Sequence, residues 1–439
     1  MDGDHRKLGG RLQSLFQDFV KQKNAELGWI RRQRECSAVS LVSLLVFGWI
    51  GKATRNFASL AMKAKVSPQA LQQRLTVRAV EMFRALLSEA LEMVFTARPP
   101  LIPLLSRFTG IVVDDSTQLK LPSILADVFP ACGGLDGTRG KAGWKLLIRY
   151  DVLTGRLYPF DLRPGKTSDR DLSINPLRDL AAGMLYLADL GYFALERLRQ
   201  VRQAGAHYIT RLPARLHVRG SDGRHGLIGA WLKNRRENQI DEEVSIGDRD
   251  SLKTRLVAVR VPEHVAAERR RKLRIKSGKR KRTVSDNQLA LCDWWVGVTD
   301  LPTARLSADE VRTLYGLRWQ VELLFKHWKQ VGGLGAIHGR TAESVQVEYL
   351  AKLVGVIVMH WQELLGGGPL EGKNRMAVHR LVTAACKQLA EALKANSDVQ
   401  TLVEILETLA AALKKLRRRP CRRKAASSRQ RVYGKRLAA

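Results

Sequence analysis

The order of strand-like and helix-like segments between residues 108 and 212 leaves few folds open to this chain. Apolar and β-branched runs predict strands, and three- and four-residue apolar spacing predicts helices. In chain order we expect a strand in 108–121, two strands joined by a turn at 153–156 within 145–162, a helix in 164–183, a strand in 184–193, a helix in 194–205 and a strand in 207–212. Three antiparallel strands followed by alternating helices and parallel strands predict a mixed sheet covered by helices.

The segments before and after this region have a different pattern of apolar residues, which suggests the domain organisation. Leu, Phe and Val recur at helical spacing before about residue 98 and again towards residue 416. We predict a helical domain over 1–98, a mixed domain over 99–345 with a β-rich insertion at about 213–290, a helical region over 346–416, and a basic, disordered tail over 417–439.

The charge balance indicates a polyanionic partner. The chain has 75 Lys and Arg against 42 Asp and Glu, a net charge of +33. Nucleic acid is the leading candidate partner, because phosphate contacts supply much of its affinity for proteins. No apolar run reaches the roughly 18 residues that span a bilayer, so we expect no membrane partner. The runs around 39–50 and 350–361 are expected to be buried core helices.

The first residues of the chain and its cysteines bear on where the protein is located. The first residues, MDGDHRKLGG, do not resemble a secretory signal, and five scattered cysteines indicate reduced thiols, so we expect a cytoplasmic protein.

Two segments are candidates for DNA contact. In the segment 59–75, Ser67 can cap a helix that begins at Pro68 and carries Arg74. This helix is either a DNA-recognition helix or part of an ordinary helical hairpin. The stretch Arg269–Arg282 holds ten cations and no acid, and we expect an exposed basic loop that contacts phosphate or is simply solvated.

Three carboxylates carry the expected chemistry. On a predicted helix over 315–329, Tyr315, Arg318, Glu322 and Lys329 fall within an arc of roughly 60°. Ordinary ion pairs at helical spacing are the alternative explanation of this stripe. Asp114 or Asp115 ends one buried strand, and Asp189 ends another. Carboxylate oxygens from separate segments suit Mg²⁺ or Mn²⁺, and two such ions can promote attack on a phosphodiester.

Together these blocks resemble the DDE transposases of insertion-sequence family four. The spacing Tyr-x2-Arg-x3-Glu-x6-Lys, met at 315, 318, 322 and 329, resembles that family's signature. The blocks VVDDSTQLKLP and LADLGYF resemble its regions around the first and second aspartates. The resemblance covers about residues 105–345 and implies a ribonuclease-H-like fold, which also matches the predicted strand order.

The resemblance implies a role for each matched residue. Asp115, Asp189 and Glu322 are the implied catalytic metal ligands, with Asp115 preferred to Asp114 because Ser116 and Thr117 follow it as in the family. The implied DNA contacts are Tyr315, Arg318, Lys329, Trp295 and Arg211. Trp295, in the doublet with Trp294, matches a tryptophan that stacks on a flipped base; a buried core tryptophan is the alternative.

The implied reaction is cut-and-paste transposition. A bacterial enzyme of this kind binds the terminal inverted repeats of its element, cuts them with two Mg²⁺ or Mn²⁺ ions, and joins the 3′ ends to target DNA as a homodimer. It is cytoplasmic and associates with the nucleoid when bound to DNA. Two alternatives remain: a catalytically inactive, transposase-derived DNA-binding protein, which the charge supports equally, and a basic RNA-binding protein, which lacks the expected aromatic motif.

Overall fold

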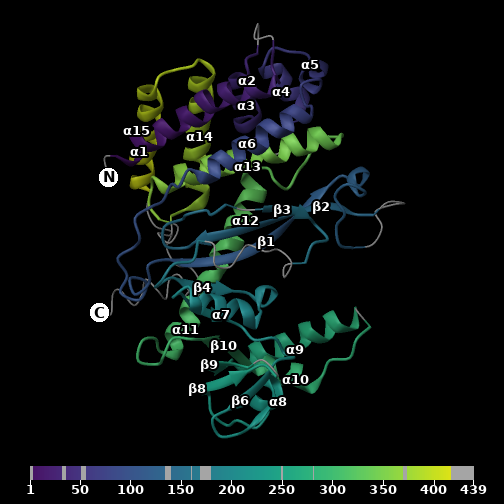
Figure 1. Ribbon diagram of the computed structural model, residues 1–439, viewed down its shortest axis with the longest axis vertical. Helices are drawn as coiled ribbons and strands as arrows, with labels where there is room; N and C mark the ends of the chain where they lie inside the picture. The colour runs from purple at the N-terminus through teal and green to yellow at the C-terminus, as the bar shows by residue number, and fades with distance from the viewer. Residues whose placement is uncertain are drawn as a thin grey trace. The chain divides into compact units, whose positions relative to one another are not determined.

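A computed structural model describes residues 3–31, 36–50, 56–133, 140–159, 161–168, 179–248, 251–279, 281–368 and 373–416 (Figure 1). The chain forms two compact units, each assembled from separated stretches of sequence. The first unit contains Met1–Pro100, Ser116–Ser168 and the described residues from Gln320 to Leu416. The second contains Leu101–Asp115 and Asp169–Trp319. The predicted tail over 417–439 and residues 169–178, half of the predicted helix in 164–183, lie outside the described residues.

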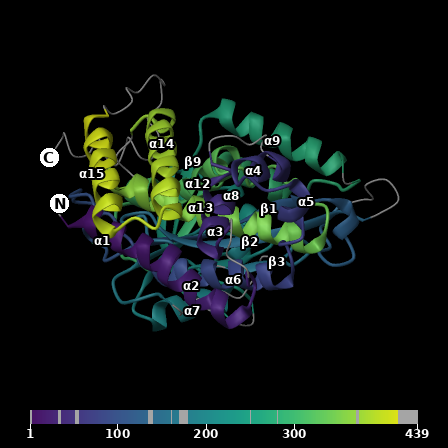
Figure 2. The ribbon, with the colours of Figure 1, turned by 90° about the horizontal axis from the view of Figure 1, so that it is seen from above.

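The first unit is mainly helical, as the apolar spacing predicts. Its described helices are α1 (Asp4–Gln13), a π-helix (Ser14–Phe19), α2 (Val20–Leu27), α3 (Ala38–Phe47), α4 (Phe57–Lys63), α5 (Pro68–Gln72), α6 (Val77–Glu92), α12 (Trp319–Val331, whose first residue is counted with the other unit), α13 (Ala342–Leu364), α14 (Arg375–Lys394) and α15 (Val399–Lys415). In Figures 1 and 2, α14 and α15 stand side by side.

Helix α13 is the central helix of this unit. Almost every one of its residues from Ser344 to Leu364 is buried, so the helix is enclosed on all sides. A Cβ atom on Gly355 would come within 2.9 Å of the Val46 carbonyl oxygen, which means that glycine permits the close approach of α3. The runs expected to be core helices are therefore α3 and α13, and none of the described helices is long and apolar enough to cross a membrane.

Strands β2 (Ala142–Asp151) and β3 (Asp161–Pro164) also belong to the first unit, beside the second half of β1 (Ile111–Leu121). The predicted turn between β2 and β3 is confirmed. The Asp151 carboxylate accepts hydrogen bonds from the Leu153 amide at 2.9 Å and the Thr154 hydroxyl at 2.7 Å, and Gly155 has a φ of +76°. Glycine adopts this left-handed conformation without a steric penalty.

The second unit holds the mixed sheet that the segment order predicts. Its strand order is β1-β4-β5-β10-β9-β8-β6-β7. The strands are the first half of β1, β4 (Leu185–Ala188), β5 (His207–Thr210), β6 (His217–Gly220), β7 (His225–Leu227), β8 (Gln239–Ile246), β9 (Leu252–Arg260) and β10 (Trp294–Thr299). β4 pairs in parallel with β1 and β5, and β10 pairs antiparallel with β5 and β9. The predicted fold class, a mixed sheet flanked by helices, is confirmed.

Three described helices lie within the predicted β-rich insertion, and one corrects the sequence analysis. They are α8 (Ile228–Lys233), α9 (Glu263–Gly278) and α10 (Asp286–Ala290), while α7 (Leu195–Gln203) and α11 (Ala308–Tyr315) lie outside it. The stretch from Arg269, expected to be a loop, is helical to Gly278. Charge alone does not prevent a helix, because Arg and Lys have high helix propensity, and Glu268 pairs with Arg271 and Lys272 one turn later.

Candidate active site

The first two candidate metal ligands lie on neighbouring parallel strands, Asp115 within β1, which continues past it to Leu121, and Asp189 directly after β4. The last paired residues of β1 and β4 are Val113 and Leu187, which lie opposite each other. Asp115 lies two residues beyond Val113, and Asp189 two residues beyond Leu187. Because side chains alternate along an extended chain, each aspartate lies on the same face as the paired residue two positions before it. The carboxylates are thus carried by adjacent strands, at corresponding positions.

The neighbouring Asp114 has a different environment. It is 2% exposed, and its Oδ2 atom accepts a hydrogen bond of 3.0 Å from the Tyr186 hydroxyl. Tyr186 lies opposite Val112 in the register, so Asp114 occupies the other face of the sheet from Asp115. Asp115 and Asp189 are half-buried. This arrangement favours Asp115 as the ligand and gives Asp114 a packing role.

The third candidate ligand, Glu322, lies on α12 of the first unit. Among the described residues, no three His, Cys, Asp or Glu side chains gather closely enough to hold a metal ion. Asp115 and Asp189 nevertheless offer only carboxylate oxygens, the donors that suit Mg²⁺ or Mn²⁺. The donor chemistry therefore fits a divalent cation, and the assignment of Glu322 as a further ligand stays a prediction.

The helix that carries the Tyr/Arg/Glu/Lys stripe is interrupted, which corrects the expected single helix over 315–329. Tyr315 ends α11, and Gly316–Arg318 forms a 3₁₀ turn before α12 begins at Trp319. A 3₁₀ turn has about 3.0 residues per turn instead of 3.6, so the calculated arc no longer holds across it. Glu322 and Lys329 remain on one face of α12, since seven residues make almost two full turns.

Lys329 is anchored to the strand that also carries Asp115. Its Nζ atom donates a hydrogen bond of 2.5 Å to the Thr117 hydroxyl of β1. Thr117 lies two residues after Asp115 and therefore on the same face of the strand. Partial burial lowers the pKa of Lys329 from its usual value. The contact joins the Lys329 face of α12 to that face of β1.

The implied DNA-contacting residues of the second unit lie together. The Trp295 and Tyr315 rings meet edge to face, with centroids 5.9 Å apart, and the Arg318 guanidinium lies 6.0 Å from the Tyr315 ring. Burial, with a contribution from the negative charge of Asp189, raises the pKa of Tyr315 to about 12 against the opposing charges of Arg318 and Arg211. At neutral pH the phenol is therefore protonated and able to donate a hydrogen bond.

The two tryptophans of the doublet are distinct. Trp294 is 2% exposed, and the Arg260 guanidinium lies 4.4 Å from its ring. Trp295, on the opposite face of β10, is half-buried and contacts Tyr315. The structure therefore brings Trp295 to the group formed by Tyr315, Arg318, Arg211 and Asp189, and leaves Trp294 in the core.

A comparison with known families decides what kind of protein carries this arrangement. Residues 106–356 match the model of the family described as "Transposase DDE domain", which is more than half of the chain. The chain belongs to this family. The predicted resemblance to DDE transposases is confirmed, and the protein is an enzyme of the transposase class.

The transposase is also similar to curated transposases along most of its length. It is 26% identical to the transposase for insertion sequence element IS231B of Bacillus thuringiensis subsp. berliner, over 78% of this chain and 77% of that protein. It is 23% identical to the transposase for IS1151 of Clostridium perfringens, over 57% and 56% of the two chains. It is 27% identical to the putative transposase InsL for IS186A of Escherichia coli (strain K12), over 50% and 61%.

One exposed aromatic residue of this transposase is not among the site residues predicted from the sequence. Trp319, the first residue of α12, is 54% exposed and directly follows Arg318. The chain therefore presents an exposed aromatic ring directly after a cation of the Tyr/Arg/Glu/Lys stripe. Its neighbours Leu317 and Val321 are buried, and the surrounding apolar pattern therefore concealed its exposure. Trp319 is two residues from both Leu317 and Val321, so on a helix it faces away from these buried side chains. This spacing could have identified Trp319 as exposed, whereas its residue type could not.

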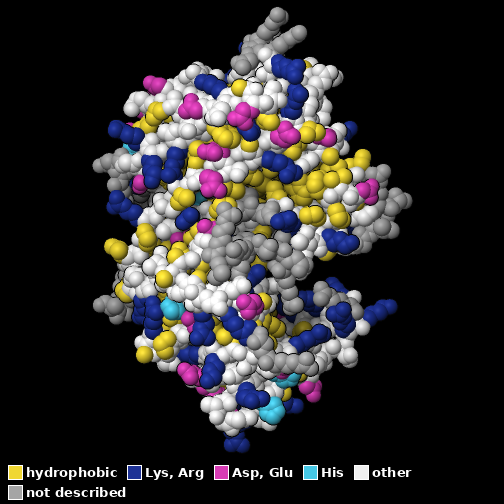
Figure 3. All heavy atoms as spheres, viewed as in Figure 1, with side chains coloured by type: hydrophobic (Ala, Val, Ile, Leu, Met, Phe, Trp, Pro, Cys, Tyr) yellow, Lys and Arg dark blue, Asp and Glu magenta, His cyan; other side chains and the backbone are white. Residues whose placement is uncertain are grey.

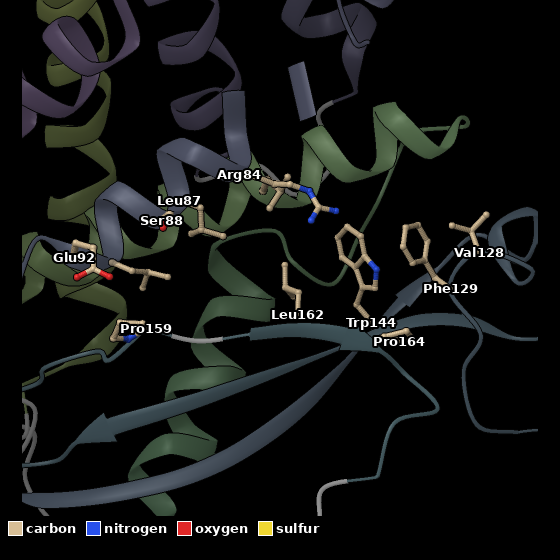
Figure 4. A pocket seen from close by; sticks show the side chains of 12 residues that line it. Arg84, Leu87, Ser88, Glu92, Val128, Phe129, Trp144, Pro159, Leu162 and Pro164 are labelled. Carbon is tan, nitrogen blue, oxygen red and sulfur yellow. The ribbon is translucent and has the colours of Figure 1, made fainter. Parts of the chain in front are cut away.

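The pocket shown in Figure 4 is separate from these residues of the transposase. It belongs to the first unit and has a volume of about 310 Å³. Its wall is mainly apolar, with Trp144, Phe129 and Leu162 on one side and the polar side chains of Arg84 and Glu92 on α6. None of its lining residues belongs to the predicted site, and we assign it no catalytic role.

Proposed function

We propose that this transposase binds the terminal inverted repeats of an insertion sequence and carries out metal-dependent DNA cleavage and strand transfer. The observation that carries the proposal is the pairing of β1 with β4, which presents Asp115 and Asp189 at corresponding positions on adjacent strands. The printed names of the relatives, all transposases of insertion sequence elements, support the type of mobile element.

Asp115, Asp189 and Glu322 are the proposed ligands of two Mg²⁺ or Mn²⁺ ions. DDE transposases generally use divalent ions, and when bound these ions activate the attacking oxygen and stabilise the leaving oxygen of a phosphodiester. Glu322 is included because it occupies the glutamate position of the Tyr-x2-Arg-x3-Glu-x6-Lys spacing that resembles the family signature.

The remaining residues of the site hold DNA in this proposal. Tyr315, Arg318 and Lys329 contact phosphate oxygens near the cut end, since a phenol, a guanidinium and an ammonium all donate to phosphate. Trp295 stacks on a base extruded from the duplex, and Arg211 adds positive charge beside it. The exposed Trp319 provides a further aromatic surface next to Arg318.

DNA binding draws on the rest of the chain as well. The net charge of +33 suits a partner whose phosphates attract cations along its length. In the first unit, Ser67 caps α5 by accepting a hydrogen bond of 3.1 Å from the Ala70 amide, and Arg74 follows the helix. We propose this segment as a DNA contact, although α5 has only five residues. Joining two transposon ends implies at least a homodimer on DNA.

The order of steps follows from the chemistry of DDE transposases. Water cuts one strand at the transposon end and releases a 3′-hydroxyl. This hydroxyl then attacks a phosphodiester of the target DNA and displaces a 3′-hydroxyl there, which joins the transposon end to the target. The carboxylates hold the ions throughout, and the basic side chains keep the phosphate in line with the attacking oxygen.

Cleavage of the element's own ends tests the proposal. We expect the purified transposase to nick a duplex that carries its terminal inverted repeat when Mg²⁺ or Mn²⁺ is added, and to bind that duplex without nicking it in EDTA. Product formation on a denaturing gel measures both. Binding without cleavage under every divalent ion would support the inactive DNA-binding alternative instead.

A further inference from the structure

Helix α9 of the second unit has two halves with different environments. In the first half, the Arg269 guanidinium donates to the Trp294 carbonyl oxygen at 2.9 Å, and Arg270 pairs with Asp293 and Glu263. These bonds attach the helix to the segment that leads into β10. Ala266 is the one residue of α9 that is fully buried. The helix is therefore held at Arg269 and Arg270, near its middle, and lacks an apolar face along its length.

The second half of α9 is exposed. In Figure 1 the helix runs outward from the strands of its unit, and Figure 3 shows dark-blue Lys and Arg side chains over this part of the surface. Arg274 and Lys276 are exposed and make no hydrogen bond or ion pair with any residue that the structure describes. Ile275, between them, is 48% exposed. Ile275 is thus an exposed aliphatic side chain that lies between two exposed cations.

These three side chains have a definite arrangement around the helix axis. At about 100° per residue, Arg274 and Lys276 lie roughly 200° apart, on opposite sides of the helix. Ile275 lies midway between them. The exposed face of α9 thus presents an apolar centre with a cation on each flank.

We propose that this half of α9 enters the major groove of duplex DNA. The major groove admits an α-helix, has a row of phosphates along each side, and exposes thymine methyl groups on its floor. Arg274 and Lys276 would reach the two phosphate rows, and Ile275 would face the base edges. A lipid surface fits less well, because an interfacial helix needs a broad apolar face. This inference rests on the proposed function, since it takes DNA as the partner.

Salt dependence separates the two kinds of contact. In fluorescence anisotropy with a labelled duplex in EDTA, we expect Arg274→Gln/Lys276→Gln to bind on the order of tenfold to a hundredfold more weakly near 0.1 M salt. The slope of log K against log salt should decrease by about 2, because each phosphate contact contributes about 0.9. Ile275→Ala should weaken binding by about threefold to tenfold with an unchanged slope, since an apolar contact releases no counterion.

A matched control removes the same charge elsewhere. Arg380 and Lys387 are exposed cations on α14, and Arg380→Gln/Lys387→Gln should leave the slope unchanged. Equal losses in the two double variants, or Ile275→Ala binding as wild type, would overturn the inference while leaving the proposed function intact. If the wild-type transposase fails to bind any duplex, the proposed function itself fails. Thermal unfolding of each variant checks that the exposed substitutions preserve the fold.

Discussion

The Asp189→Ala variant is expected to lose cleavage of the transposon end by on the order of 10³-fold or more while it retains DNA binding. A metal site contributes several kcal/mol of transition-state stabilisation, and each 1.4 kcal/mol is a factor of ten in rate. Asp189 is half-buried and follows β4 at the position that corresponds to Asp115 on β1. Single-turnover cleavage with Mg²⁺ measures the rate, and a binding assay in EDTA measures the affinity.

Asp114→Asn is the matched control for this experiment. Asp114 is buried and accepts a hydrogen bond from Tyr186, and an asparagine oxygen can accept the same bond. We expect Asp114→Asn to cleave within about tenfold of the wild-type rate and Asp115→Asn to behave like Asp189→Ala. The reverse order of the two asparagine variants would show that Asp114 is the ligand. Normal cleavage by Asp189→Ala would remove the basis of the proposed mechanism.

The second large effect concerns stability. Glu348 is fully buried and accepts hydrogen bonds from Lys352 at 2.6 Å, from the His338 amide at 2.8 Å and from the Gly339 amide at 2.8 Å. Lys352 is also buried and lies 4.5 Å from the Trp49 ring. Because Glu348→Gln leaves the Lys352 charge without its partner, we expect it to lower the free energy of unfolding by about 3–5 kcal/mol.

The double variant Glu348→Gln/Lys352→Met distinguishes a charge effect from general disruption. Removing both charges eliminates the uncompensated ammonium, so urea denaturation should show that the double variant is more stable than Glu348→Gln. If the double variant is as unstable as the single one or less stable, the loss comes from packing and backbone hydrogen bonds instead of the charge pair. The same network fixes the loop between α12 and α13, to which His338 and Gly339 belong.

Local signals were sufficient for much of the fold. The β-branched run at Ile111–Val113 and the apolar run at Leu185–Ala188 both form strands, and the turn before Leu157 forms because Asp151 and Gly155 suit it. Ser67 caps α5 as its residue type predicts. These features depend on neighbours within a few residues, which is the range over which sequence patterns carry information.

Other features depend on contacts that a sequence pattern does not contain. The 3₁₀ turn at Gly316–Arg318 interrupts a continuous helical pattern, since the residues on both sides still show helical spacing. The basic stretch after Arg269 forms a helix that is anchored by Cys292 and Trp294 carbonyl oxygens, about 25 residues away in the sequence. Neither could be predicted from charge or periodicity alone.

The candidate site was only partly predictable for a similar reason. Alternation predicted that one of Asp114 and Asp115 faces the site, but the choice depended on a family resemblance. The Tyr186 hydroxyl gives a physical reason for the same choice, because it donates a hydrogen bond to the Asp114 carboxylate on the face of the sheet opposite to Asp115. For the tryptophan doublet, the contact between Trp295 and Tyr315 likewise supplies what spacing could not.

The central claim is that carboxylates from distant parts of the chain share divalent ions, and iron-directed cleavage of the protein tests it most directly. Fe²⁺ with ascorbate and peroxide cuts a polypeptide near the bound metal. The transposase, bound to a duplex that carries its terminal inverted repeat, would be treated with these reagents, and the protein fragments would be sequenced. We expect cuts around Asp115, Asp189 and Glu322 together, all suppressed by excess Mg²⁺. Cuts near Asp115 and Asp189 without any near Glu322, or no competition by Mg²⁺, would contradict the account.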